Sequence, residues 1–391
     1  MPHDPYKALY IHLPFCKHRC AYCDFTTRAI APDSVEIDEY IDNLILELRR
    51  KAKEGELAEI ETVYLGGGTP SFVGQARLSK LLYALGVSMN LTPEVECSME
   101  ANPDSLTPEL IRDIYALGVN RLSIGVQSFD DGLLRTLDRI HDSARAKQAV
   151  LDARERFENV SVDLMCGVPG QTPEMFEADV QTAVDLGVTH VSVYPLTIED
   201  HTPFRRMVDS GEIGDVDQDK EALMMSMAPN VLTPAGFHRY EVASYAREGF
   251  ECKHNIAYWT GRGYLGLGRS AAGMLDAEDF DRLAGLFPDV PARGDAYRVR
   301  LVQRDDAATA FEAEYLSQRE AAAEDLMLAC RMTRGIGPDL LVRSASVIAA
   351  DELVAACDRA LELGLATWVP DYVEGHAGCV ASKDVIAGRA H

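Results

Sequence analysis

Three cysteines near the start of the chain, Cys16, Cys20 and Cys23, lie close enough in sequence to hold one metal centre. They follow a Cys-x3-Cys-x2-Cys pattern directly after a short apolar run at residues 8–12. Thiolates are the usual ligands of iron-sulfur clusters, and three of them leave one iron of a four-iron cube open. The spacing therefore predicts a [4Fe-4S] cluster whose free iron suits the amino and carboxylate groups of S-adenosylmethionine (SAM).

Two other kinds of site are compatible with this loop taken alone. One is a structural zinc site with His12, His18 or Asp24 as the fourth ligand, and the other is a redox-active Cys20-x-x-Cys23 pair. The position of the loop after the first strand of a repeating strand-helix array favours the cluster. The other cysteines are scattered singly, as expected of reduced thiols: Cys97, Cys166, Cys252, Cys330, Cys357 and Cys379.

The elements that must position this loop are alternating strands and helices between residue 8 and about residue 197. The expected strands are apolar enough to be buried on both faces of a parallel sheet: 8–12, 62–65, 95–101, 121–126, 160–165 and 190–195. The expected helices are 35–53, 76–86, 107–117, 130–138, 142–157 and 173–186, two of them opened by Thr-Pro pairs at 107–108 and 172–173. This α/β pattern predicts a partial (βα)6 barrel related to the TIM barrel.

Polar residues lie where such a barrel forms its pocket, at the carboxyl ends of the strands. A glycine-rich turn, Gly-Gly-Gly-Thr-Pro-Ser at 66–71, follows the second strand, and its glycines would let the backbone approach a ligand. Glu100 ends the third strand, Gln127 the fourth, and Asp163 lies near the end of the fifth. Each could be an ordinary buried polar residue, but their joint placement predicts a binding site.

The alternation stops after about residue 205, and the chain is expected to form two further parts. Residues 206–304 include a helix near 217–234 and a loop at 276–295, and they are expected to form an accessory layer on a barrel domain of residues 1–205. Residues 305–391 are expected to form a small winged-helix-like domain. Its expected elements are helices at 313–330, 337–345 and 350–363 and strands at 364–369 and 376–382.

The overall charge limits the partners. The formal net charge is -24, and such a surface repels phosphate backbones and anionic lipid headgroups. Neither a secretory signal nor an apolar run long enough to span a bilayer is recognisable. We therefore expect a cytoplasmic protein that neither binds nucleic acid nor inserts into membranes.

The cysteine loop and the glycine-rich turn together resemble those of the radical SAM superfamily. By resemblance to coproporphyrinogen-dehydrogenase-like members, these residues are expected to contact SAM: Tyr10, Tyr22, Gly67, Gly68, Thr69, Glu100, Gln127, Arg139 and Asp163. The same resemblance implies that the thiolates of Cys16, Cys20 and Cys23 hold the cluster.

Further segments resemble the HemW-type haem chaperones of this superfamily: residues 168–172, 240–247, 252–259 and 332–336. The resemblance implies binding of haem or another tetrapyrrole as cargo and its delivery to haem-acceptor proteins. An electron donor such as flavodoxin is a further expected partner.

The related oxygen-independent coproporphyrinogen III oxidases of the HemN type carry a fourth cysteine two residues after the third. This chain has Phe25 there, which favours the chaperone branch, for which porphyrinogen decarboxylation is not implied. An oxidase or another radical enzyme acting on a tetrapyrrole stays the alternative.

His254, in the segment His-Asn-Ile-Ala-Tyr-Trp at 254–259, is the residue we expect to ligate haem iron, because a neutral imidazole is a good iron ligand. Tyr258 and Trp259 could pack a flat macrocycle, and Cys252 is an alternative ligand. One departure from the family pattern is Ser270-Ala271-Ala272, where relatives usually have Gly-Ala-His. If that histidine binds tetrapyrrole or SAM in relatives, its loss bears on the haem role here.

Overall fold

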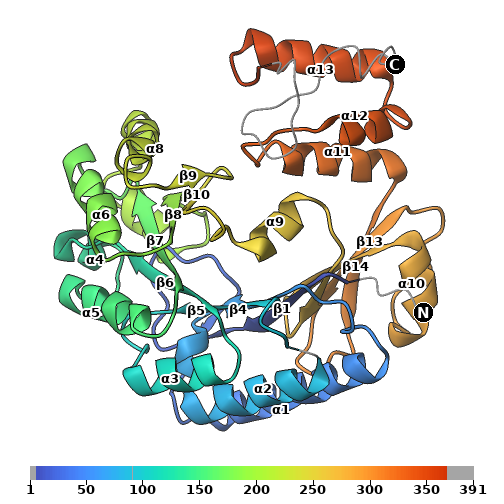
Figure 1. Ribbon diagram of the computed structural model, residues 1–391, viewed down its shortest axis with the longest axis horizontal. Coiled ribbons are helices and arrows are strands. Elements are labelled where there is room, and N and C mark those ends of the chain that lie inside the picture. Colours follow the sequence, from blue (N-terminus) through green and yellow to red (C-terminus); the bar gives the residue numbers. More distant parts are fainter. Residues whose placement is uncertain (1–5, 90, 368–391) are drawn as a thin grey trace.

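A computed structural model describes residues 6–89 and 91–367 and shows an open, mostly parallel sheet with helices along its outer side (Figure 1). The central strands neighbour one another in chain order and pair in parallel. They are β1 (Ala8–Leu13), β4 (Thr62–Gly67), β5 (Glu96–Ala101), β6 (Arg121–Gln127), β7 (Asn159–Cys166) and β8 (His190–Pro195). All six expected strands are thereby confirmed, and the sheet does not close, as expected of a partial barrel.

The helices between these strands also form where the pattern predicts them: α1 (Val35–Lys53), α2 (Gln75–Ser88), α3 (Pro108–Ala116), α4 (Asp131–Thr136), α5 (Ser143–Arg154) and α6 (Pro173–Asp185). The Thr107 hydroxyl accepts a hydrogen bond from the backbone N–H of Leu110, and Thr172 does the same for Met175. Both helices have proline in their first turn, where its missing N–H costs nothing. These local signals explain why the helices begin where they do.

Residues beyond 205 extend the sheet at both edges instead of forming the accessory layer that we expected. On one side β11 (Tyr264–Leu267) pairs in parallel with β1, and on the other β10 (Ser244–Ala246) pairs antiparallel with β8. The sheet has 12 strands in the order β14-β13-β12-β11-β1-β4-β5-β6-β7-β8-β10-β9. The added outer strands are β9 (His238–Arg239), β12 (Ala272–Asp276), β13 (Arg298–Gln303) and β14 (Phe311–Leu316).

The helices of this region are α7 (Pro203–Asp209), α8 (Gln218–Leu232), α9 (Lys253–Trp259) and α10 (Ala277–Leu283). The prediction of a loop at 276–295 was wrong in its first part, because Asp276 caps α10 by accepting from the Asp279 N–H, and a 3-10 turn (Ala284–Leu286) follows. The helix expected at 313–330 begins later, at Gln318. The residues before it alternate along β14 and pair with β13, and Ser317 with Glu320 forms a capping box that starts the helix.

The C-terminal helices form a separate block beside the sheet (Figure 1): α11 (Gln318–Ala329), α12 (Pro338–Ala345) and α13 (Ala350–Glu362). They bury a small apolar cluster that includes Leu341, Ile348 and Leu353. Residues 364–367 form a turn and an irregular segment in place of the first part of the strand expected at 364–369. The rest of that strand and the strand expected at 376–382 lie outside the described residues. The boundary expected at 305 falls within the β13–β14 hairpin.

Within residues 6–89 and 91–367, no helix combines the length and apolar character needed to cross a membrane.

Candidate iron-sulfur and SAM site

The cysteine loop leaves β1 and is closed by a short parallel pair, β2 (Phe15–Cys16) with β3 (Arg28–Ala29). The thiol of Cys16 is buried, whereas those of Cys20 and Cys23 lie in a partly exposed turn in which the Cys23 N–H donates to the Cys20 carbonyl at 3.1 Å. All three cysteines line one cavity of about 430 Å³. The expected ligands are therefore brought together at a space that could hold a cluster and a small molecule.

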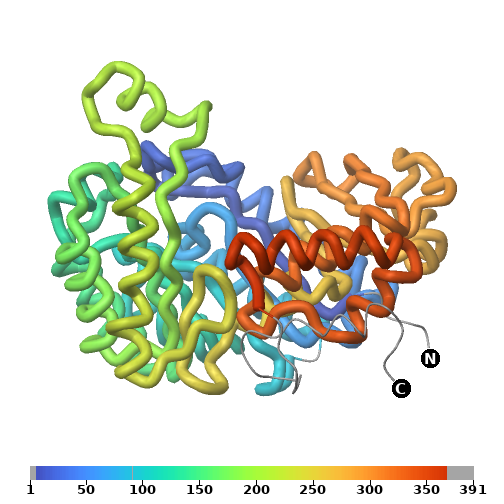
Figure 2. The backbone as a smooth tube through the Cα atoms, turned by 90° about the horizontal axis from the view of Figure 1, so that it is seen from above, coloured from blue at the N-terminus to red at the C-terminus, as the bar shows by residue number. Residues whose placement is uncertain are grey.

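Packing from the far side of the barrel holds this loop. Ala21 belongs to an apolar cluster with Leu133, Met165 and Phe204, and the backbone N–H of Phe204 donates to the Ala21 carbonyl at 3.0 Å. The segment that includes α7 projects at one end of the molecule beside the N-terminal part drawn in dark blue (Figure 2). Residues remote in sequence thus fix the conformation of the cysteine loop.

All of the residues expected to contact SAM, except Tyr10, line the same cavity: Tyr22, Gly67, Gly68, Thr69, Glu100, Gln127, Arg139 and Asp163. Those from the glycine-rich turn and from β5, β6 and β7 lie at the carboxyl ends of neighbouring parallel strands, where the barrel pattern predicts a pocket. Tyr10 does not line the cavity and lies behind the ring of Tyr64. Its hydroxyl hydrogen-bonds Nδ1 of His12 at 3.0 Å, and its ring lies 6.3 Å from that of Tyr64, which does line the cavity.

The glycine-rich turn docks onto the cysteine loop through backbone contacts that need glycine. The Gly68 N–H donates to the Leu13 carbonyl at 2.9 Å, and the Thr69 N–H donates to the Phe15 carbonyl at 2.8 Å. A Cβ on Gly68 would lie 2.7 Å from the Phe15 carbonyl oxygen and 2.8 Å from that of Leu13. Gly67 has φ 111°, a conformation that other residues rarely adopt. The turn can therefore form this cradle only with glycine at these positions.

Glu100 and Asp163 are the carboxyl residues that the barrel strands contribute to the cavity. Burial and the nearby charge of Asp163 raise the pKa of Glu100 to about 7, against the opposing effects of the Gly67 N–H and the Tyr64 hydroxyl. Each of these donors lies 3.0 Å from one Glu100 oxygen. Burial also raises the pKa of Asp163, whose oxygens accept from the Ser123 hydroxyl at 3.1 and 3.2 Å. Such a pair favours a ligand that carries positive charge.

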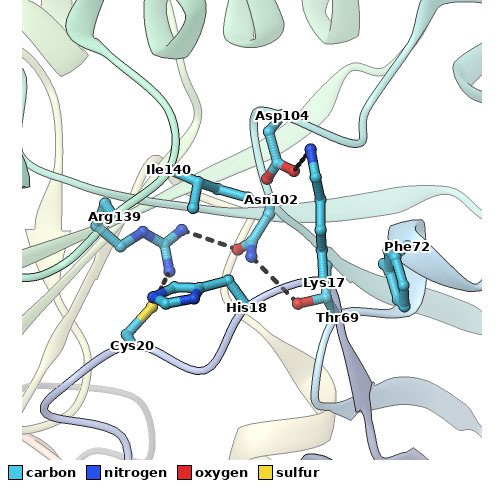
Figure 3. A pocket seen from close by; sticks show the side chains of 9 residues that line it. All are labelled: Lys17, His18, Cys20, Thr69, Phe72, Asn102, Asp104, Arg139 and Ile140. Atoms are coloured by element: carbon cyan, nitrogen blue, oxygen red, sulfur yellow. Dashed lines mark hydrogen bonds and ion pairs between the residues drawn. The ribbon is translucent and has the colours of Figure 1, made fainter. Parts of the chain in front are cut away.

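Gln127, the last residue of β6, and Arg139, in the segment after α4, also line the cavity. The Arg139 guanidinium donates to the Gly125 carbonyl at 2.6 Å, to Oδ1 of Asn102 at 2.9 Å and to Sγ of Cys20 at 3.4 Å (Figure 3). Gln127 has φ 69° beside a register shift in the β6–β7 pairing. A non-glycine residue held in this region is characteristic of functional sites.

Several further residues that were not expected from the sequence also line the cavity: Tyr64, Asn102, Ser123 and Tyr194. Asn102 and Tyr194 stand at strand ends, a signal that could have identified them. Tyr64 and Ser123 lie within strands, where a run buried on both faces does not show which residues point into the barrel. Phe25 also lines the cavity and is 72% exposed, so an apolar ring stands where the HemN-type pattern has its fourth cysteine.

His254 is not at this cavity. Its side chain is 1% exposed, Nδ1 hydrogen-bonds the Thr62 hydroxyl at 2.9 Å, and its ring stacks on Tyr64 with centroids 5.1 Å apart. Burial lowers the pKa of the imidazole to about 3, so the ring is neutral. Cys252 is also buried, and its Sγ contacts Glu96 at 3.6 Å. Neither side chain is open to a macrocycle in this arrangement, so the geometry does not support the expected ligation of haem iron.

Ala272, which stands where relatives usually have histidine, begins β12 and pairs with Val302. It does not line the cysteine cavity, whose lining residues come from the barrel strands and the loops that follow them.

Comparison with known proteins identifies the family. The model of the Radical SAM superfamily matches residues 10–183. The chain is 34% identical over 331 residues to the heme chaperone HemW of Lactococcus lactis, covering 84% of this chain and 83% of the relative. The chain belongs to the radical SAM superfamily, in its HemW group. It is also 40% identical over 277 residues to the heme chaperone HemW of Mycobacterium tuberculosis, covering 70% of this chain and 71% of that one.

A solved structure shows the same fold. The coproporphyrinogen III oxidase HemN of Escherichia coli, described as a radical SAM enzyme, superimposes with a TM-score of 0.73 at 21% identity, covering 92% of this chain and 84% of that one. Membership of the radical SAM superfamily implies a [4Fe-4S] cluster and SAM. The residues of this chain fit both groups, because three thiols and a glycine cradle share one cavity with two half-buried carboxyls.

Proposed function

We propose that this protein binds haem and delivers it to haem-acceptor proteins. The observation that carries the proposal is the extent of the similarity to relatives described as heme chaperones. It runs over 331 residues, whereas the superfamily model matches only residues 10–183. The similarity therefore extends well beyond the part of the chain that any radical SAM protein would share.

We assign Cys16, Cys20 and Cys23 to the cluster, and we assign to SAM those of the expected SAM-binding residues that line the cavity. A reduced cluster of this kind supplies one electron to the sulfonium of SAM. The protein contributes positioning: Glu100 and Asp163 present carboxyl groups to a cation, and the glycine-rich turn lines the same cavity. In a chaperone the cluster and SAM could serve structurally or gate the release of haem.

For the cargo we assign a second cavity of about 350 Å³ on the other side of Tyr194, which lines both cavities. Aromatic rings from α9 and β11 contribute to its wall, among them Tyr258, Trp259 and Tyr264. The rings of Tyr258 and Tyr264 are 4.6 Å apart and nearly edge-to-face. Aromatic walls suit a flat macrocycle, and these rings are half-buried whereas the His254 imidazole is enclosed.

Haem titration followed by absorption spectroscopy tests the proposal. We expect wild type to bind haem, and Tyr258→Leu to weaken binding about tenfold because an aromatic contact of about 1.4 kcal/mol is lost. Tyr115→Ala, which removes an exposed tyrosine from α3, is the matched control and should bind as wild type does. Wild type that binds no haem would overturn the proposal. A spectrum or affinity changed by His254→Ala would instead restore that residue as the iron ligand.

Two alternatives have decisive experiments. Anaerobic incubation of the reconstituted protein with coproporphyrinogen III, SAM and a reductant should leave the substrate unchanged, and formation of protoporphyrinogen would assign an oxidase.

Metal analysis after anaerobic purification should find iron and acid-labile sulfide. About one zinc per chain without sulfide would assign a zinc-binding protein instead.

A further inference from the structure

A chain of hydrogen bonds links two of the three cysteine sulfurs through side chains alone. At one end the Thr69 hydroxyl donates to Sγ of Cys16 at 3.5 Å, and at the other the Arg139 guanidinium donates to Sγ of Cys20 at 3.4 Å. Asn102 joins the two ends. Its Oδ1 accepts from Arg139 at 2.9 Å, and its Nδ2 donates to Oγ1 of Thr69 at 3.1 Å (Figure 3).

The amide of Asn102 determines where both donors point. A guanidinium has no acceptor, so the amide oxygen must face Arg139 and the amide N–H₂ must face Thr69. The Thr69 hydroxyl has one proton, and because its oxygen already accepts from Asn102, that proton is free to point at Cys16. Arg139 is held by Asn102 and by the Gly125 carbonyl, which leaves its other terminal nitrogen directed at Cys20.

Asn102 is itself held in place from the neighbouring strand end. Its backbone N–H donates to the Ser71 hydroxyl at 3.0 Å, and Ser71 lies 2.7 Å from the hydroxyl of Ser105. Ser71 belongs to the 3-10 turn Pro70–Val73, directly after the glycine-rich segment. The amide therefore reaches the two donors from rigid backbone at the carboxyl end of β5.

We infer that Asn102 is a positioning residue that keeps a hydroxyl and a guanidinium donor on two of the cluster's ligand sulfurs and so raises the reduction potential of the cluster. Donors to cluster sulfurs stabilise the reduced state, which carries one more negative charge. The inference rests on the cluster that the family implies and does not depend on the delivery of haem.

The test is a redox titration of the anaerobically reconstituted protein, with the reduced cluster followed by electron paramagnetic resonance. Asn102→Leu removes the amide that orients the Thr69 hydroxyl and the Arg139 guanidinium. In Asn102→Asp the Thr69 proton turns to the new carboxylate and away from Cys16. For both variants we expect the ratio of reduced to oxidised cluster at a fixed potential to fall about tenfold, equivalent to about 59 mV for one electron.

Asn120→Leu is the matched control. Asn120 also bridges two groups, accepting from the Cys97 N–H at 2.8 Å and donating to the Val95 carbonyl at 2.8 Å, but it lies at the opposite end of β5 from the cavity. We expect the potential of this variant to equal that of wild type. If the reduction potential of Asn120→Leu shifted as far as that of the Asn102 variants, the shift would reflect general packing, and the inference would be overturned.

The isosteric variant keeps the test decisive if Asn102→Leu does not fold. An Asn102→Asp protein with wild-type iron content and an unchanged potential would overturn the inference, even if its affinity for SAM were lower. Wild type that takes up no iron and sulfide would instead overturn the cluster assignment itself. Failure to bind haem would affect only the proposed function.

Discussion

Glu100 and Asp163 direct carboxyl groups into one cavity, where burial raises the pKa of both and the charge of Asp163 raises the pKa of Glu100 further. A ligand with a positive charge opposes both shifts, as the sulfonium and ammonium groups of SAM would. At the scale of single residues, the cavity thus selects its ligand by charge, and the protonation of Glu100 should control affinity near neutral pH.

We therefore expect SAM to bind less tightly as pH falls from about 8 to about 6. The pKa of Glu100 is raised to about 7 in the ligand-free protein, so the attractive carboxylate is replaced by a neutral acid below that pH. Equilibrium dialysis with the reconstituted protein measures this dependence. Glu100→Gln should bind about tenfold more weakly at pH 8 and lose most of the pH dependence, because one charge-assisted contact is missing. The exposed Glu109→Gln is the control.

The same carboxyl should destabilise the ligand-free protein at high pH. Its folded pKa of about 7 exceeds the ordinary 4.5, so the stability it contributes is complete below pH 4.5 and lost as pH rises through 7. Glu100→Gln should then raise the free energy of unfolding by about 2 kcal/mol at pH 8 and change it little at pH 4.5. Urea denaturation at both pH values measures this, and an equal effect at both would contradict the assignment.

At the scale of elements, the site depends on how the β4 turn meets the cysteine loop. The turn donates two backbone hydrogen bonds to carbonyls of residues 13 and 15, at a distance that excludes a side chain on Gly68. A loop carrying metal ligands is thus fixed by contacts with a neighbouring strand end. Replacing this glycine should therefore disturb both stability and assembly of the cluster.

Gly68→Ala should lower the free energy of unfolding by about 2 kcal/mol and reduce iron incorporation, because its Cβ would collide with two carbonyl oxygens. Gly86→Ala is the matched control. Gly86 lies inside α2, and a Cβ added there would meet no atom within 4 Å, so alanine should stabilise by up to about 1 kcal/mol. Thermal unfolding and iron analysis measure both effects, and a Gly68→Ala protein as stable as wild type would refute the close approach.

At the scale of the whole molecule, distant parts of the chain meet around the two cavities. β11 lies against β1, α9 contacts β4, and α11 contacts α9. Tyr194, at the end of β8, lines both cavities. The SAM cavity itself joins residues of five barrel strands, β4 to β8, to the cysteine loop, so a ligand there stabilises contacts across much of the barrel.

SAM at about a hundredfold its dissociation constant should therefore raise the free energy of unfolding by about 2.7 kcal/mol, provided that it binds only the folded chain. Thermal unfolding of the reconstituted protein with and without SAM measures the shift. The shift should be smaller in Glu100→Gln at the same SAM concentration. Equal shifts in both proteins would show that this carboxyl does not contact the ligand.

Much of the barrel could be predicted because its signals are local. A strand buried on both faces must be apolar throughout, a helix on its outer side must show its own period, and Thr107 and Thr172 cap the helices that follow them. The three cysteines are close in sequence, so their shared site did not depend on the rest of the fold. The strand-end rule then indicated Glu100, Gln127 and Asp163 without any knowledge of their contacts.

The amino-acid sequence by itself thus determined the barrel strands, the cysteine loop and most of the residues around it. Only the tertiary structure decided that β11 joins β1, that Tyr10 lies behind Tyr64, that His254 is enclosed and that Asn102 joins Thr69 to Arg139. These contacts join residues from about 30 to about 250 positions apart. Local periodicity reports whether a side chain is buried, but not which distant side chain buries it.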